Sequence, residues 1–148
     1  MTTTHSIRPV ALCVFRRANA ILVSRGQDPA NGETFFRPLG GGIEFGERSD
    51  EATRREIREE LGAEVKHLSF LGTLENIFKY KGRPCHEIVF VYDGRLMDDA
   101  LYAKAVLHGT EADGSPLEAV WKPLEDFHDD HPPLYPHGLL ELLRANVE

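Results

Sequence analysis

The most informative feature for chemistry is a group of three glutamates, Glu56, Glu59 and Glu60. Their spacing of i, i+3 and i+4 places all three side chains on one face of a helix. Like charges at this spacing destabilise an isolated helix by roughly 0.2–0.5 kcal/mol per pair. A hard divalent cation such as Mg²⁺ would turn this repulsion into a binding site, because it prefers oxygen ligands. The residues therefore indicate metal-assisted chemistry, although a solvated helix face with ion pairs to Arg55 would also explain them.

A glycine-rich segment, Gly40 to Gly42, precedes these glutamates. Glycine permits positive φ and close approach of the backbone to a neighbour, which a contact between a carbonyl group and a metal would need. The spacing does not match the GxxxxGK[ST] pattern, and no lysine follows the glycines, which argues against a P-loop. A flexible turn is the alternative interpretation.

The stretch from Gly41 to Ala63, GGIEFGERSDEATRREIREELGA, resembles the Nudix box of the Nudix hydrolases. Every fixed Gly, Glu and Arg of that pattern is present at the matching distance. The sequence departs from it at Ala63, where the family prefers a larger aliphatic residue, so a packing contact changes and no catalytic group is lost.

The resemblance implies roles for individual residues. Glu56 and Glu60 would ligate the metal directly, Glu59 would bind it or its water shell, and the Gly40 carbonyl would contribute from the loop. The resemblance also implies that Arg55 orients a neighbouring glutamate. Glu47, across the loop, is the expected partner, and neither residue is assigned as the catalytic base.

The general base in this family often lies outside the box, so its position is less well determined. Glu87, in the segment HEIVFVYDG, is the first candidate, and Glu111 and Glu118 are the others. A surface charge or a structural partner is the ordinary alternative for each. His86 alternates to the opposite face of the expected strand, so it would not act with Glu87 as an adjacent pair.

Substrate recognition would need cations for phosphates and aromatic rings for a base. The candidates for phosphate contacts are Arg25, Arg37, Lys79, Lys81 and Arg83, and the candidates for stacking are Phe36, Phe78 and Tyr80. Each aromatic residue could instead belong to the core. Tyr80 lies 17 residues past the box, at a distance similar to that of a tyrosine in Nudix hydrolases acting on dinucleoside polyphosphates.

Size and charge are consistent with one domain spanning residues 1–148, with a net charge of −7 that argues against general nucleic-acid binding. No apolar run approaches the roughly 20 residues that cross a bilayer, and the start MTTTHSIRPV lacks a signal-peptide pattern. We interpret Cys13 and Cys85 as reduced thiols. We therefore expect a cytoplasmic protein, with no membrane or nucleic-acid partner, that is a monomer or a homodimer.

Apolar runs and alternation predict strands at 7–15, 20–25, 65–80, 85–96 and 117–123, with a short strand-like run at 35–37. Residues 38–42 should break regular structure, and 101–107 fit either a helix or a strand. A helix is expected from Ser49, as its N-cap, to Leu61, with Gly62 at C′. A second helix is expected at 137–146.

This pattern predicts a mixed α+β protein, a sheet covered by helices. The resemblance implies more specifically a Nudix-like α-β-α sandwich with a mixed central sheet. It also implies a Mg²⁺-dependent hydrolase, with Mn²⁺ as an alternative ion, that cleaves a pyrophosphate linkage in a small nucleotide. Candidate substrates are dinucleoside polyphosphates, which Tyr80 favours slightly, ADP-ribose or another nucleotide sugar, and (d)NTPs. The rival interpretations are a catalytically silent nucleotide sensor and a structural domain with an acidic helix.

Overall fold

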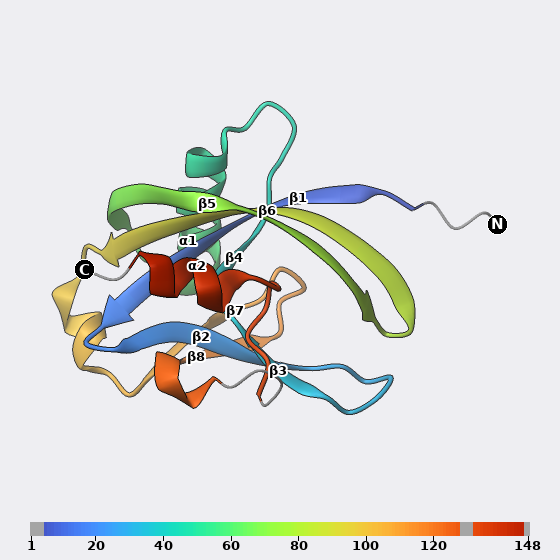
Figure 1. The fold of residues 1–148 in the computed structure, drawn as a ribbon. Helices are drawn as coiled ribbons and strands as arrows, with labels where there is room; N and C mark the ends of the chain where they lie inside the picture. The colour runs from blue at the N-terminus through green and yellow to red at the C-terminus, as the bar shows by residue number, and fades with distance from the viewer. Residues whose placement is uncertain (1–4, 128–131, 147–148) are drawn as a thin grey trace.

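The computed structural model describes residues 5–127 and 132–146. Its strands form one sheet in the order β5-β6-β1-β2-β8-β7, with β3 added beside β2 and β4 beside β1 (Figure 1). The strands are β1 (Ile7–Arg17), β2 (Ala20–Gln27), β3 (Thr34–Arg37), β4 (Leu39–Gly42), β5 (Val65–Tyr80), β6 (Arg83–Leu96), β7 (Val106–Thr110) and β8 (Pro116–Pro123). The helices are α1 (Ser49–Leu61) and α2 (Leu139–Ala145), with 3₁₀ turns η1 (Asp99–Ala103) and η2 (Leu124–Asp126). Because β1 and β6 run parallel and the other pairs antiparallel, the sheet is mixed, as predicted.

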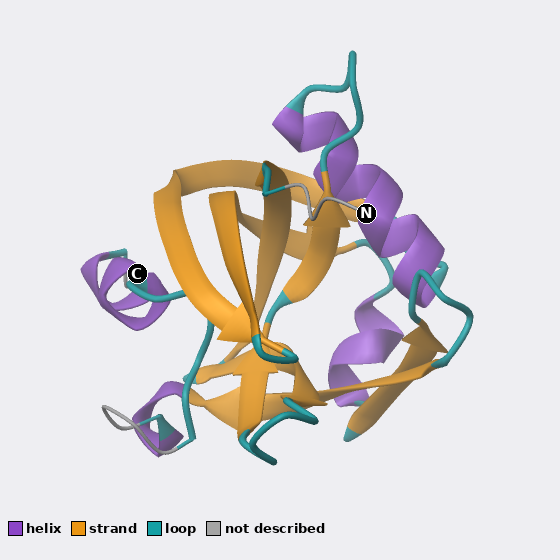
Figure 2. Ribbon diagram, turned by 90° about the vertical axis from the view of Figure 1, so that its right-hand side faces the viewer, coloured by secondary structure: helices purple, strands orange, loops and turns teal. Residues whose placement is uncertain are grey.

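Strand β1 lies at the centre of the molecule, and all its residues from Val10 to Phe15 are fully buried. Successive side chains of a strand point to opposite faces of the sheet. Cys13 accordingly packs with Ile57 of α1, whereas the even-numbered residues of this run pack with Leu139 and Leu143 of α2. The two helices therefore cover opposite faces (Figure 2), which confirms the predicted α-β-α sandwich.

Helix α1 begins at Ser49 and ends at Leu61, the predicted bounds. The prediction that Ser49 is the N-cap is wrong, because Arg48 holds that position and its backbone N–H donates to the Glu51 carboxylate at 2.8 Å. The Ser49 hydroxyl instead forms a 2.6 Å hydrogen bond with the hydroxyl of Tyr92. Gly62 ends the helix in the left-handed conformation, with φ of 65°.

The expectation that residues 38–42 break regular structure is also wrong. Leu39–Gly42 forms β4, which pairs antiparallel with β1 from Cys13↔Leu39 to Val10↔Gly42. Gly40 lies so close to β1 that a Cβ there would meet the backbone carbonyl of Ala11. The glycines that look like loop residues in the sequence are thus what permits this close pairing.

Two further segments differ in detail from the prediction. The ambiguous run 101–107 divides between η1 and β7. The β5–β6 turn needs only Lys81 and Gly82, whose φ values of 55° and 73° suit a tight hairpin, so β6 already begins at Arg83. Among the described residues, no helix is long and apolar enough to cross a membrane.

Candidate active site

Arg55 lies at the centre of the box and holds the helix and the loop together. Its Nε and Nη2 atoms donate to the two carboxylate oxygens of Glu47 at 2.7 and 2.9 Å. Its Nη1 atom donates to Glu56 at 3.0 Å and to Glu59 at 3.2 Å, and Nη2 also reaches the Gly42 carbonyl at 2.9 Å. The hydrogen bond to Glu47 is the largest of the interactions that raise the pKa of Arg55, and it lowers the pKa of Glu47. The structure thus contains the Arg55–Glu47 contact across the loop that the sequence predicted.

The glycines of β4 pack directly against the glutamate face of α1. The Gly40 backbone N–H donates to the Glu60 carboxylate at 2.9 Å. A Cβ added to Gly41 would lie 2.6 Å from the carboxyl carbon of Glu56. The backbone at Gly41 can approach the Glu56 carboxylate so closely only because this position is glycine.

The environment of the two buried box glutamates opposes their ionisation when no cation is bound. Burial, together with the nearby Glu56 and Glu111 carboxylates, raises the pKa of Glu60 to about 8. Burial also raises the pKa of Glu56, despite its hydrogen bond to Arg55. A divalent cation would favour the ionised forms of both groups. The donor set therefore fits a hard cation chemically.

The geometry of the box carboxylates in this structure is set by hydrogen bonds within the protein. Arg55 engages Glu56 and Glu59, while Glu60 turns to the Gly40 N–H. Within residues 5–127 and 132–146, no three His, Cys, Asp or Glu side chains are close enough together to hold a metal ion. Metal binding at the box would require these carboxylates to move toward a common point.

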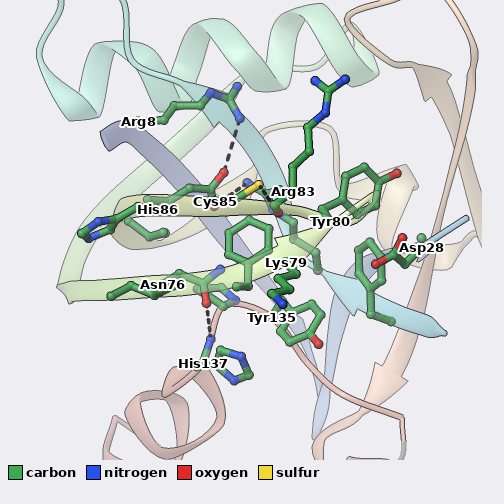
Figure 3. A pocket seen from close by; sticks show the side chains of 18 of the residues that line it. Arg8, Asp28, Asn76, Lys79, Tyr80, Arg83, Cys85, His86, Tyr135 and His137 are labelled. Carbon is green, nitrogen blue, oxygen red and sulfur yellow. Dashed lines mark hydrogen bonds and ion pairs between the residues drawn. The ribbon is translucent and has the colours of Figure 1, made fainter. Parts of the chain in front are cut away.

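A large open cleft of about 1610 Å³ is lined by residues of β1, β2, β3, β5 and β6 (Figure 3). The β5–β6 hairpin forms one wall, and β3 with the turn before it forms another. The Lys81 backbone N–H donates to the buried Asp28 carboxylate at 3.1 Å, which ties the hairpin tip to the β2–β3 turn. Most of the residues predicted to bind substrate line this cleft, namely Arg25, Arg37, Phe78, Lys79, Tyr80 and Arg83, whereas Lys81 and Phe36 do not.

The remaining candidates divide between the cleft and other regions. Glu87 and Glu111 line the cleft, and Glu118 does not. Phe36, a stacking candidate, belongs to the core on the α2 side, where its ring centroid lies 6.0 Å from that of Phe127. The neighbouring Phe35 lines the cleft instead.

Three residues that line the cleft were not predicted from the sequence to bind substrate. Phe35 and Tyr135 lie with ring centroids 5.3 Å apart, and Tyr80 meets Phe35 edge-on at 6.3 Å. Arg8 enters from the start of β1, where the parallel pairing places it opposite Glu87. Tyr135 and Arg8 are brought to the cleft by contacts far apart in the chain, for which the sequence carries no local signal.

Glu87 lies where the cleft meets the box. Its side chain is only 8% exposed and is paired with two guanidinium groups. Arg8 Nη1 donates to one carboxylate oxygen at 3.4 Å, and Arg37 Nη2 lies 3.9 Å from the other. Glu87 therefore lines the cleft with both of its carboxylate oxygens facing guanidinium groups.

Solved structures of several proteins share this fold. The MutT NUDIX hydrolase from Burkholderia pseudomallei is 22% identical, with a TM-score of 0.61 and coverage of 97% of this chain and 100% of that chain. A NUDIX hydrolase from Nitrosomonas europaea is 13% identical, with a TM-score of 0.64 and coverage of 94% and 87%. An ADP compounds hydrolase is 21% identical, with a TM-score of 0.58 and coverage of 93% and 71%. At these identities the likeness shows a common fold.

The family assignment comes from the sequence profile of the NUDIX domain, which matches residues 6–142. This match extends far beyond the box and includes the strands that form the cleft. The box, the sandwich and the profile agree. This chain belongs to the NUDIX domain family.

Proposed function

We propose that this protein is a divalent-metal-dependent hydrolase that cleaves the pyrophosphate linkage of a nucleoside diphosphate derivative. One observation carries this proposal. All three box glutamates are present on α1, which packs against the glycines of β4, and a cleft lined by cations and aromatic rings lies nearby. Arg37 connects the two parts, because it lines the cleft and its positive charge opposes the burial that raises the pKa of Glu60. A substrate in the cleft would therefore have its phosphates near the box.

The proposed ion is Mg²⁺, with Mn²⁺ as an alternative. Glu56 and Glu60 would hold it directly, Glu59 would hold it or its water shell, and the Gly40 carbonyl would complete the set. When bound, the cation would neutralise phosphate charge and make a water molecule more acidic. Arg55, through its two hydrogen bonds to Glu47 and its contacts to Glu56 and Glu59, would keep the carboxylates oriented.

The proposed substrates are dinucleoside polyphosphates, ADP-ribose or another nucleotide sugar, and (d)NTPs. The lining of the cleft supports a ligand with an aromatic base, since Phe35, Tyr80 and Tyr135 gather in it. Lys79 and Arg25 lie in the same cleft and would contribute phosphate contacts. The volume of the cleft exceeds the roughly 300–1,000 Å³ of ordinary small-molecule pockets. Because a large cleft suits a large ligand, dinucleoside polyphosphates are the substrate class that we favour.

We also propose that residues 1–148 form a single Nudix domain that works in the cytoplasm as a monomer or homodimer. One sheet contributing to both cores supports a single domain. The two free thiols, Cys13 and Cys85, support a reducing compartment.

Substitution of Glu60 tests the metal-ligand assignment. Glu60→Gln removes the charge at nearly constant shape, and we expect Mg²⁺-dependent turnover to fall by roughly 10²–10³-fold. Circular dichroism should show an unchanged fold. Glu64→Gln is the matched control, since Glu64 is an exposed carboxylate paired with Arg58 at 2.7 Å. Equal turnover of the Glu60→Gln variant and wild type would remove the assignment.

A screen of diphosphate-linked nucleotides with Mg²⁺ or Mn²⁺ identifies the substrate class. Release of a nucleoside monophosphate from one class would support the proposed function and select among the three candidates. Tight binding of one compound without hydrolysis of any would instead support the sensor interpretation.

A further inference from the structure

Two arginines from different strands converge on one buried carboxylate at the border of the cleft. Arg8 lies at the start of β1 and Arg37 at the end of β3, and both reach Glu87 on β6. Figure 3 shows the Arg8 side chain pointing toward this carboxylate from above the strands. A buried carboxylate is costly unless it is paired, so Glu87 keeps both guanidinium groups near it.

Arg8 also extends toward the box. Its guanidinium group lies over Gly42, where a Cβ would be 3.1 Å from the Arg8 Nη2 atom. Gly42 is the last residue of β4, and the neighbouring Gly41 packs against the Glu56 carboxylate. Arg8 therefore lies between Glu87 and the strand that contacts the box carboxylates.

Both arginines keep donors for a ligand. The Arg8 side chain is 57% exposed and that of Arg37 is 30% exposed, and both line the cleft. A guanidinium group presents five N–H donors in a planar arrangement that matches phosphate oxygens. The contacts to Glu87 use only part of each group.

We propose that Arg8 and Arg37 bind the two phosphoryl groups of the substrate's diphosphate, and that Glu87 is the residue that positions both arginines. This inference rests on the proposed function, because it places the diphosphate between the box and the cleft. It differs from the interpretation of Glu87 as the general base. Both Glu87 oxygens face guanidinium groups, and the side chain is almost fully buried, so neither is directed at an attacking water.

The first experiment measures steady-state kinetics with ADP-ribose and with diadenosine tetraphosphate in Mg²⁺. Arg8→Gln and Arg37→Gln should each raise KM by about 10- to 100-fold, the loss of a charge-assisted hydrogen bond. Arg8→Lys should recover part of this loss. Arg8 is exposed at the start of its strand, so its variants are not expected to misfold. KM values within twofold of wild type for both glutamine variants would overturn the proposal.

The matched control is Arg16→Gln. Arg16 and Asp93 form an ion pair at 3.2 Å between the same two strands, β1 and β6, at the end away from the cleft. This substitution removes a comparable structural contact, and KM should remain at its wild-type value. A rise in KM equal to that of Arg8→Gln would show a structural effect and contradict the proposal.

Glu87→Gln separates positioning from base catalysis. Loss of a positioning residue should raise KM about 10-fold and leave the acid limb of the kcat–pH profile in place. Loss of a general base should lower kcat by about 10²–10⁴-fold and remove that limb. The second result would overturn the positioning role, and the Arg8 variants test the phosphate contacts even if the Glu87 variant folds poorly.

Calorimetric titration with ADP and Mg²⁺ distinguishes failure of this inference from failure of the proposed function. If wild type hydrolyses neither substrate but Arg8→Gln weakens ADP binding at least 10-fold, the proposed hydrolysis fails and the phosphate contact stands. If wild type hydrolyses a substrate and neither arginine variant changes KM or ADP affinity, the function stands and this inference fails.

Discussion

At the scale of single residues, Glu60 connects the fold with the chemistry. Its carboxylate is held by the Gly40 N–H and lies near two other carboxylates, Glu56 and Glu111. Burial and these neighbours favour the protonated form, so its pKa rises to about 8 from an ordinary value of 4.5. The same position that makes Glu60 costly without a cation would make it a strong ligand with one.

This environment predicts how stability without metal depends on pH. Between about pH 4.5 and 8 the folded protein keeps a proton on Glu60 that the unfolded chain has lost. The free energy of unfolding should therefore fall as pH rises through this window, by up to about 5 kcal/mol, because each pKa unit corresponds to about 1.4 kcal/mol. Urea unfolding in EDTA at pH 5.5 and 8.5 measures this change. The comparison with Glu60→Gln isolates it, since that variant should lose this component while Glu64→Gln keeps it. Equal pH dependence of wild type and Glu60→Gln would contradict the assignment.

At the scale of elements, β4 and the loop that leads from it into α1 bring the backbone and the box carboxylates together. Gly41 has no φ in the left-handed region, so its requirement for glycine comes from the Glu56 carboxylate that fills the space of a side chain. Gly46, farther along the loop, shows the opposite case. Its φ is 85° and no atom lies near the position of its Cβ.

These two glycines give a controlled test of the loop. Gly41→Ala should displace Glu56, and we expect metal affinity and turnover to fall by about 10- to 100-fold. Gly46→Ala should cost about 1–2 kcal/mol of stability through backbone strain and should leave metal affinity nearly unchanged. Titration with Mn²⁺ and chemical denaturation measure the two effects. Equal metal affinity of the two variants would contradict the crowding argument.

The same scale shows what could be predicted from the sequence. The bounds of α1 were correct because helix ends depend on local signals such as Gly62. Strand β4 was missed because glycines at a close strand pairing resemble a loop when neighbouring strands are unknown. The Arg8–Glu87 pair was missed for a related reason, since its two residues are 79 positions apart and meet only through the register of parallel strands. Features set by neighbouring residues could be predicted from the sequence, whereas the pairing of distant strands could not.

At the scale of the whole molecule, β1 separates two cores with different relations to the site. The core under α1 contains Ile57, which fixes the helix that bears the box glutamates. The core under α2 contains Leu143 and lies on the opposite face of the sheet. Both side chains are fully buried. A substitution in the core under α2 should therefore reduce stability alone, whereas one in the core under α1 should reduce both stability and activity.

Truncation of one residue in each core tests this separation. Ile57→Ala and Leu143→Ala should each lower the free energy of unfolding by about 2–5 kcal/mol, because each leaves a cavity in a packed core. Only Ile57→Ala should also lower kcat, by roughly 10-fold, since a small shift of α1 moves its carboxylates relative to the glycines of β4. Denaturation curves, together with turnover measured under conditions where circular dichroism shows both variants to be folded, provide the measurements. Equal losses of kcat would show that the sheet transmits disturbance from either face to the site.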